Sequence, residues 1–280
     1  MPRRARGDGQ TRPADAAAIP DAGVGKAGDG KDRQFVTALA RGLEILSCFG
    51  ARSEIGGTQV AAMTGLPQPT VWRLCYTMQQ LGFLTAAIGS DKLRPGLPLL
   101  KLGRAALASM PLAEAARPRM QALADRFGSA TGLAARDGDR MVFVQRCLSD
   151  AALVMNLRVG ARLPLAISSV GWGLLAGFPA AERDTMVARH AAADPSWPEA
   201  RPHFEAAMAG YERSGFILNL GVFRPGYNGA AVPILDASGR PAFALSCAGA
   251  ATSHTSALLR REIGPALLEL GASLQGGLEG

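Results

Sequence analysis

The chain has 280 residues, of which 48% are hydrophobic and 19% charged, and its formal net charge is +7 at pH 7. These values indicate a globular protein with about two domains. The longest apolar runs, such as residues 170–178, are far shorter than the roughly 20 residues of a membrane span. We therefore expect neither a transmembrane segment nor a membrane partner.

The cysteines indicate the compartment. Cys48, Cys75, Cys147 and Cys247 are scattered and show no CxxC spacing, which is typical of reduced thiols in a cytoplasmic protein. The arginines near the N-terminus are not followed by the apolar core of an export signal. We expect a cytoplasmic protein.

The positive charge is spread along the chain, so it permits nucleic-acid binding without locating it. Residues 1–33 hold no aromatic residue and are rich in Gly, Ala, Asp, Arg and Pro, which predicts a flexible arm. The arm contains a GxGxxG pattern at Gly23, Gly25 and Gly28. We interpret this pattern as a linker rather than a dinucleotide site, because no predicted strand precedes it and no predicted helix follows it. Contact between the basic arm and DNA phosphates is a further alternative.

The residues that follow the arm predict three helices, over 35–49, 58–64 and 68–81. Thr58 is a candidate N-cap for the second helix. A tight turn at 65–67 separates the second helix from the third, and Gly82 is suited to terminate the third helix in the left-handed conformation.

The third helix has two different faces. One face is apolar and predicts burial: Val71, Leu74, Cys75, Met78 and Leu81. The other face carries Pro69, Trp72, Arg73, Tyr76 and Gln80. No Asp or Glu occurs between residues 68 and 82, so this second face is suited to a negatively charged partner.

Two short strands, 83–86 and 91–94, are expected to form a hairpin with Lys92 and Arg94 beside its tip. Helix, short helix, tight turn, helix and basic hairpin is the order of a winged helix-turn-helix, whose helix after the turn enters the major groove of DNA. The alternative is a three-helix packing unit with a solvated outer face.

Residues 97–110 predict an apolar connecting helix that Pro111 interrupts, and a second helix is expected over 112–127. Each of them can pack on a second copy of the chain or on the chain's own core.

Strand and helix patterns alternate after residue 130, which indicates a mixed α/β domain. We expect strands at 133–135, 141–144, 153–157, 216–220, 230–235 and 242–247, and helices at 168–178, 181–190, 201–215 and 256–274. Pro233 and Pro241 require edge or terminal positions in their strands.

Catalytic chemistry is scarce in this domain. His190, His203 and His254 have no partner at metal-ligand spacing, and Ser169 lacks the glycine of a nucleophile elbow because Ile167 stands there. We expect no enzyme, no metal and no cofactor. The segment 167–173 opens a helix whose free N–H groups can hold an anion, although a simple capped helix start explains it equally well.

From about residue 35 to 274 the chain resembles the IclR family of transcriptional regulators. The segments that carry the resemblance are ALARGLEILSCF, TGLPQPTVWRLCYTMQQLGFL, GARLPLAISSVGWGLLA, AAVPILDASGRPAFALS and GPALLELGASL. The resemblance implies an α+β protein with a winged helix-turn-helix at 34–95, a linker helix at 96–111 and a GAF-like effector-binding domain at 112–280. Such regulators assemble as dimers or tetramers on double-stranded operator DNA and respond to a small-molecule effector, often an organic or aromatic acid.

Positions carried over from the family define two candidate sites. The DNA-binding candidates are Thr58, Gln68, Pro69, Thr70, Trp72, Arg73, Tyr76, Lys92 and Arg94. The effector-binding candidates are Ser168, Ser169, Val170, Trp172, Asn219, Gly229, Ser246 and Ala248.

The chain departs from the family pattern at several pocket positions, where it has Ala166, Trp172, Asn219, Gly221-Val222 and Ala248. We interpret these departures as a less polar pocket for a larger or more aromatic ligand, in which Trp172 provides a packing surface. Ser169, Asn219 and Ser246 are then the orienting polar groups. The competing hypothesis is a small-molecule-binding module or enzyme whose N-terminal helices only dimerise it.

Overall fold

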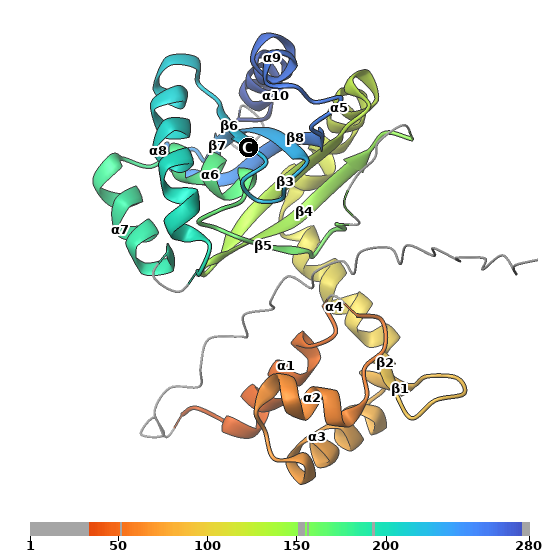
Figure 1. The fold of residues 1–280 in the computed structure, drawn as a ribbon. Helices are drawn as coiled ribbons and strands as arrows, with labels where there is room; N and C mark the ends of the chain where they lie inside the picture. Colours follow the sequence, from red (N-terminus) through yellow and green to blue (C-terminus); the bar gives the residue numbers. More distant parts are fainter. Residues whose placement is uncertain (1–33, 51, 151–154, 156, 192–193, 276–280) are drawn as a thin grey trace, which may run out of the picture.

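The computed structural model describes residues 34–275, with gaps at 51, 151–154, 156 and 192–193. The expected arm and its GxGxxG pattern therefore lie outside the described residues. The described residues form an N-terminal helical unit and a larger α/β unit, which are connected through one helix (Figure 1). No helix in the described part of the chain is long and apolar enough to cross a membrane.

The N-terminal unit begins with three helices, α1 (Thr37–Ser47), α2 (Gly57–Thr64) and α3 (Gln68–Gln80). They enclose a small core of nearly inaccessible side chains: Ile45, Ile55, Val60, Val71 and Leu84. Burying an aliphatic side chain of this size contributes about 1.5–3 kcal/mol. These contacts hold the three helices together as one unit.

The N-terminus of α2 differs from the prediction. Gly56, not Thr58, is the residue that precedes the helix, and the side-chain Oε1 of Gln59 accepts a hydrogen bond from the Gly56 N–H at 3.2 Å. The backbone N–H of Gly56 is thus bonded to the side chain of the third residue of the helix. Thr58 is left exposed inside the first turn.

As predicted, Gly82 after the end of α3 has a left-handed conformation, with φ at 75°. Gly65, in the predicted turn, is the left-handed C-cap of α2, with φ at 67°. Val71, Cys75 and Met78 are buried. Leu81, which the helical spacing placed on the buried face, is instead 63% exposed. The reason is that α3 ends at Gln80, so Leu81 stands beyond the last regular turn.

The hairpin consists of β1 (Leu84–Ala86) and β2 (Leu93–Pro95), which pair antiparallel with Thr85 opposite Arg94. A bridge between Ile55 and Leu93 attaches the hairpin to the loop before α2. The wing is therefore fixed to the helices and does not depend on its own two short strands.

Two helices follow the wing. Helix α4 (Leu97–Ala108) has no buried residue, whereas α5 (Pro111–Phe127) buries one face that includes Leu112, Ala116 and Met120. Pro111 stands in the first turn of α5, where its missing N–H costs nothing. The connection between the two units is thus α4, and α5 already belongs to the core of the second.

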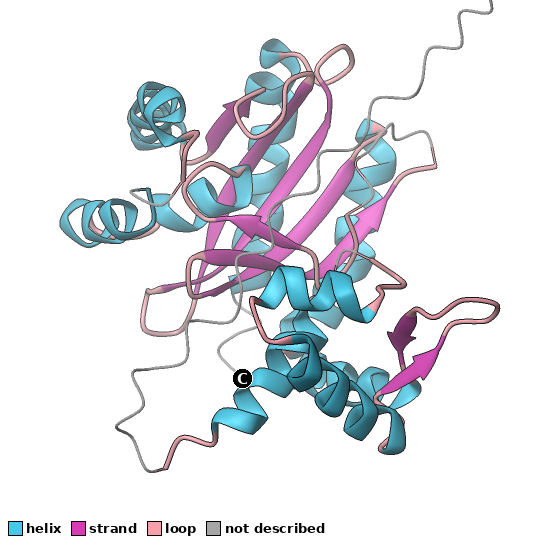
Figure 2. Cartoon of the chain, turned by 60° about the horizontal axis from the view of Figure 1, so that its bottom comes forward, coloured by secondary structure: helices cyan, strands magenta, loops and turns pink. Residues whose placement is uncertain are grey.

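The second unit is built on a six-stranded antiparallel sheet in the order β5-β4-β3-β8-β7-β6. Its strands are β3 (Ala130–Asp137), β4 (Arg140–Leu148), β5 (Arg162–Pro164), β6 (Ile217–Leu220), β7 (Tyr227–Leu235) and β8 (Pro241–Ala250). Figure 2 shows these strands side by side with helices packed against the sheet.

The sheet separates two hydrophobic cores. Its helices are α6 (Ser169–Ala176), α7 (Ala180–Ala191), α8 (Trp197–Ser214), α9 (Ser256–Leu258), the π-helical turn η1 (Leu259–Ile263) and α10 (Gly264–Gln275). Helices α5 and α10 contribute Met120 and Leu267 to one core, and α6 and α8 contribute Trp172 and Phe204 to the other.

Several predicted elements of this unit are shifted. Helix α8 begins at Trp197, earlier than expected, because Pro198 is tolerated in the first turn. Pro233 lies inside β7, opposite Ala244 of β8, and not at the edge or terminal position that was expected. The pairing of β6 with β7 stops at Ala231, so β6 does not reach Pro233. The expected strand 153–157 is not formed at Met155 or Leu157, and its other residues lie outside the described part.

Candidate DNA-binding face and effector pocket

The outward face of α3 carries two large aromatic side chains. Trp72 and Tyr76 are each 63% exposed, and Gln68, Pro69 and Arg73 are exposed beside them. No carboxylate of the described residues forms an ion pair with Arg73. The face therefore presents an uncompensated positive charge next to aromatic surface.

The second helix positions this face. The side-chain N–H of Gln68 donates to the Thr58 hydroxyl at 3.1 Å, which connects the starts of α3 and α2. The indole of Trp72 lies close to Gly57, where an added Cβ would be 3.9 Å from the ring. Thr58 thus acts here through Gln68, while Thr70 is half-buried at the same end of α3.

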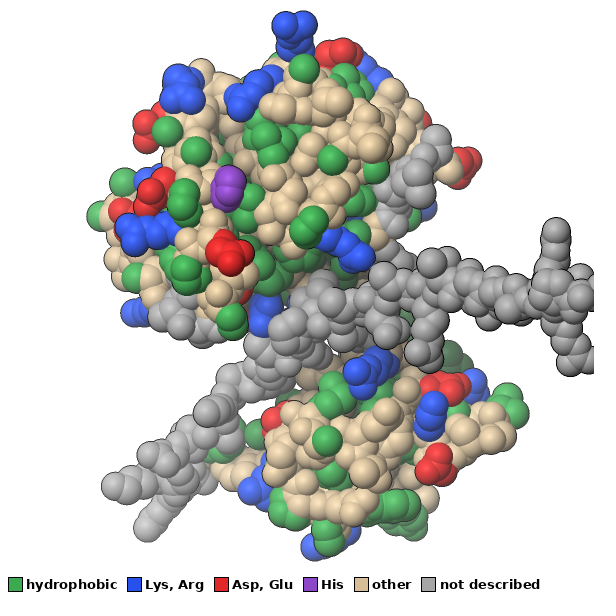
Figure 3. All heavy atoms as spheres, in the orientation of Figure 1, with side chains coloured by type: hydrophobic (Ala, Val, Ile, Leu, Met, Phe, Trp, Pro, Cys, Tyr) green, Lys and Arg blue, Asp and Glu red, His purple; other side chains and the backbone are tan. Residues whose placement is uncertain are grey.

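The wing adds two cations. Lys92 and Arg94 are exposed, and the Arg94 Nε donates to the Thr85 hydroxyl of the opposite strand at 3.2 Å. In the space-filling view, hydrophobic side chains with some basic atoms beside them lie at the lower end of the N-terminal unit, where α3 lies (Figure 3). Aromatic and basic groups on an exposed helix with a basic wing match the needs of DNA binding.

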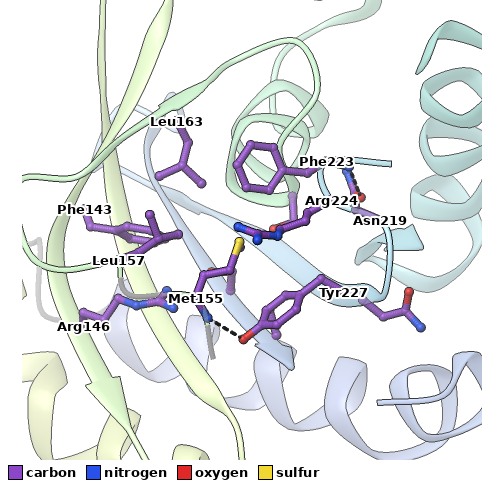
Figure 4. A pocket seen from close by; sticks show the side chains of 14 residues that line it. Phe143, Arg146, Met155, Leu157, Leu163, Asn219, Phe223, Arg224 and Tyr227 are labelled. Carbon is purple, nitrogen blue, oxygen red and sulfur yellow. Dashed lines mark hydrogen bonds between the residues drawn. The ribbon is translucent and has the colours of Figure 1, made fainter. Parts of the chain in front are cut away.

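The second unit has a pocket on the sheet face opposite α5 and α10, between β4, β7, β8 and the start of α6 (Figure 4). Five predicted effector-binding residues meet there: Ser169, Asn219, Gly229, Ser246 and Ala248. Its cavity volume is about 30 Å³, which is enough to hold water. A larger ligand must displace the side chains at its mouth.

Three other predicted effector-binding residues do not line this pocket. The Ser168 hydroxyl is the N-cap of α6, accepting from the Gly171 N–H at 3.1 Å and donating to the Pro164 carbonyl. Val170 is buried in the core. Trp172 is fully buried, with its ring Nε1 donating to the Ala166 carbonyl at 2.6 Å and its edge against Phe204. None of the three lines the pocket that contains Ser169.

The predicted orienting groups Asn219 and Ser246 already have partners within the protein. The Asn219 amide donates to the Ile167 carbonyl at 2.9 Å and accepts from the Phe223 N–H at 3.2 Å. The Ser246 hydroxyl donates to the Gly132 carbonyl at 3.3 Å. These bonds fix the loop after β6 and the strand pair β3–β8. The hydrogen-bonding groups of Asn219 and Ser246 are thus used within the protein, and their main effect is on the shape of the pocket.

The sequence-based reasoning missed the charged and aromatic residues of the pocket. These are Phe143, Arg146, Phe223, Arg224 and Tyr227. Figure 4 shows the guanidinium groups of Arg146 and Arg224 pointing toward the middle of the pocket, with Met155 near them. The Tyr227 hydroxyl accepts from the Met155 N–H at 3.0 Å, and burial raises the pKa of Tyr227. One sequence signal could have indicated these residues. Arg146 is a charged residue within the mostly apolar strand segment MVFVQRCL, where an arginine is unusual.

The four cysteines are buried and free, as their scatter predicted. Burial raises the pKa of the Cys247 thiol to about 11, and this thiol contacts the Ser129 hydroxyl. Such a thiol is protonated and unreactive at neutral pH. Within the described part of the chain, no three His, Cys, Asp or Glu side chains are grouped as metal ligands.

Family comparisons agree with this architecture. The profile described as "Bacterial transcriptional regulator IclR C-terminal" matches residues 104–274, and the "IclR helix-turn-helix domain" profile matches residues 38–86. The chain belongs to the IclR family. Its relatives are transcriptional regulators, and it is a regulator of this kind, with a helix-turn-helix domain and an effector-binding C-terminal domain.

Individual relatives cover nearly the whole family region. The HTH-type transcriptional regulator TsaQ1/TsaQ2 of Comamonas testosteroni is 34% identical over 86% of this chain and 88% of its own length. An IclR-family regulator structure from Brucella abortus has a TM-score of 0.75 and 34% identity over 90% of this chain and 96% of that one. An IclR homologue from Microbacterium hydrocarbonoxydans, complexed with 4-hydroxybenzoate, has a TM-score of 0.70 and 25% identity over 87% and 99%.

Proposed function

We propose that this IclR-family regulator reads its operator with the exposed face of α3, places the wing on adjacent phosphates, and changes its DNA affinity when a small organic acid occupies the pocket. The observation that carries the DNA-binding part is the acid-free face of α3 with Trp72, Arg73 and Tyr76 exposed together. We assign DNA binding to residues 34–95, the linker to 96–111 and effector binding to 112–280.

The exposed residues divide into two roles. Arg73, Tyr76, Lys92 and Arg94 have the charge or hydroxyl group that suits phosphate contacts. Gln68, Pro69, Thr70 and Trp72 stand at or near the start of α3, which is the end that meets base edges and thymine methyl groups in a helix-turn-helix complex. Thr58 orients Gln68 through their hydrogen bond.

A second copy of the chain is part of this proposal. Helices α1 and α4 leave large apolar side chains in solvent: Phe35 and Val36 just before α1, Leu39 and Leu43 in α1, and Leu97, Leu100 and Leu102 in α4. Large apolar side chains left in solvent in this number on two helices indicate an interaction site. A symmetric dimer would present two α3 helices to half-sites about 34 Å apart on a pseudo-palindromic operator.

The effector acts through differential affinity for two arrangements of the dimer, with a coupling of about 1–3 kcal/mol. The structural relative bound to 4-hydroxybenzoate supports an aromatic acid as one class of ligand. Because α4 connects the two units and packs against α5, it is the element through which such a change can reach the wing.

The test is fluorescence anisotropy on the regulator's own upstream DNA and on scrambled DNA, at two salt concentrations. We expect a specific excess that survives the higher salt. Arg73→Ala should weaken binding to both DNAs, whereas the control Arg261→Ala, which changes an exposed arginine of the second unit, should not. Equal binding of wild-type protein to both DNAs, or an unchanged Arg73→Ala variant, contradicts the proposal.

A further inference from the structure

Arg146 of the pocket is partly buried, and burying an arginine without a charged partner lowers the stability of a protein. The Nε of Arg146 is buried and has no hydrogen-bond partner among the described residues. Its guanidinium carbon lies 4.6 Å from the centre of the Phe143 ring. Burial lowers the pKa of Arg146, and the nearby Tyr227, Cys147 and Cys247 oppose this shift to a lesser extent. A buried guanidinium without a carboxylate lacks the compensation that buried charges normally have.

The surroundings of Arg146 offer no anion. No Asp or Glu is among the described residues that line the pocket, and Arg224 adds a second guanidinium at its mouth. The uncharged polar groups Asn219 and Ser246 are bonded within the protein. Arg146 and Arg224 are therefore the strong donors that the pocket offers a ligand, and Arg146 is the more buried of the two.

The strand geometry aims Arg146 at the ligand. The pairing of β3 with β4 shifts between Leu133 and Ala134, so that Val144 is an extra residue on β4. This bulge puts Phe143 and Arg146 on the same face of the sheet, although they are three residues apart. The ring of Phe143 then supports the guanidinium, and its planar fork can meet two oxygens of one oxyanion.

We infer that Arg146 is the specificity-determining residue of the pocket, and that it selects effectors that carry an oxyanion on an apolar body. The oxyanion pairs with Arg146 deep in the pocket, and the apolar body packs among Phe143, Leu163 and Phe223. This inference rests on the proposed effector site. It replaces Trp172, Ser169 and Asn219 by Arg146 as the feature that determines which ligand is bound.

The experiment compares benzoate and benzenesulfonate with the uncharged benzamide by calorimetry on the full-length protein. Wild-type protein should bind each anion at least about tenfold more tightly than benzamide, because a charge-assisted pair is lost with the amide. Arg146→Gln should remove this preference, and affinity for benzamide should stay within about twofold. The matched control Arg261→Gln changes an exposed arginine of the same unit that does not line the pocket, and it should retain the preference.

A second variant keeps the test independent of how Arg146→Gln folds. Arg146→Met removes the uncompensated charge but keeps an unbranched apolar chain, so it should unfold at a temperature no lower than wild type without ligand. An arginine with a purely structural role would give a lower unfolding temperature. That result, a wild-type protein without anion preference, or a preference that survives Arg146→Gln overturns the inference.

Operator binding separates this inference from the proposed function. Both Arg146 variants should bind operator DNA like wild type when no ligand is added, because Arg146 is far along the chain from α3 and lies in the other unit. Loss of specific DNA binding by wild-type protein would contradict the proposed function alone, since the comparison of anion and amide does not depend on it.

Discussion

Gly132 on β3 controls the position of Phe143, and through it the support of Arg146. A Cβ added at Gly132 would overlap the Phe143 ring, which is nearly inaccessible to solvent. We predict that Gly132→Ala lowers the free energy of unfolding by about 1–3 kcal/mol, since the ring must leave its place. The same variant should weaken binding of benzoate. Urea denaturation and calorimetry check the two effects.

A glycine in open space is the control for this prediction. Gly210 lies within α8 and an added Cβ would meet nothing within 4 Å. Gly210→Ala should therefore leave stability unchanged or raise it by up to about 1 kcal/mol, as expected for glycine replaced inside a helix. Equal losses in both variants would show that Phe143 is not held by contact with Gly132.

His254 gives a pH-dependent stability that can be measured. Its ring is buried, its Nε2 has no partner among the described residues, and burial lowers its pKa below the ordinary histidine value of 6.5. The unfolded chain then binds more protons than the folded chain as the pH falls through 6.5, so stability declines toward the lower folded pKa. We predict a lower unfolding free energy at pH 5.5 than at pH 7.5.

Substitution assigns this pH effect. His254→Asn should reduce the difference between the two pH values, while the exposed His203→Gln should leave it as in wild type. Urea titrations at pH 5.5, 6.5 and 7.5 provide the comparison. A pH dependence that His254→Asn leaves unchanged would mean that carboxylates, not the buried imidazole, cause it.

At the scale of single elements, periodicity predicted helices and most strands but could not predict the bulge in β4. Strict alternation places Phe143 and Arg146 on opposite faces of a strand. The extra residue Val144 puts them on the same face. The position of this bulge is set by the pairing with β3, and the local sequence of β4 does not reveal it. For this reason the cationic character of the pocket was missed, although the residues that surround it were partly found.

At the start of α6, the sequence allowed two interpretations, and the structure decides between them for Ser168. The segment 167–173 allowed either an anion site or a capped helix start. The Ser168 hydroxyl is occupied by the Gly171 N–H and the Pro164 carbonyl, so it acts as a cap. Trp172 is hydrogen-bonded in the core because α8 covers that side of α6, which one sequence segment does not reveal.

The cap of α6 can be tested directly. Ser168→Ala removes a buried hydroxyl that makes two hydrogen bonds, and we predict a loss of about 1–2 kcal/mol in unfolding free energy. Ser196 also precedes a helix but makes no capping bond with its side chain. Ser196→Ala should therefore cost less than about 0.5 kcal/mol. Comparable losses in thermal or urea unfolding would argue against the capping role.

For the whole molecule, the distribution of buried and exposed leucines distinguishes the two units. The α/β unit encloses its two cores, whereas α4 has no buried residue in one chain and exposes 69% of Leu100. The sequence showed that α4 is apolar. It did not show whether these apolar residues pack in the chain's own core or against a partner. The structure of the described chain favours a partner outside it, which a second copy with the same surface can supply.

Leu100→Glu tests this arrangement, because a carboxylate in an apolar interface between copies has no compensating partner. We predict that the variant sediments at half the mass of wild type at micromolar concentration, and that its operator affinity falls more than about tenfold as the second half-site contact is lost. Leu148→Glu, at an exposed leucine of the other unit, is the control and should behave like wild type. If Leu100→Glu keeps both the mass and the operator affinity, α4 is not the surface that joins two copies, and the half-site spacing proposed for the operator loses its basis.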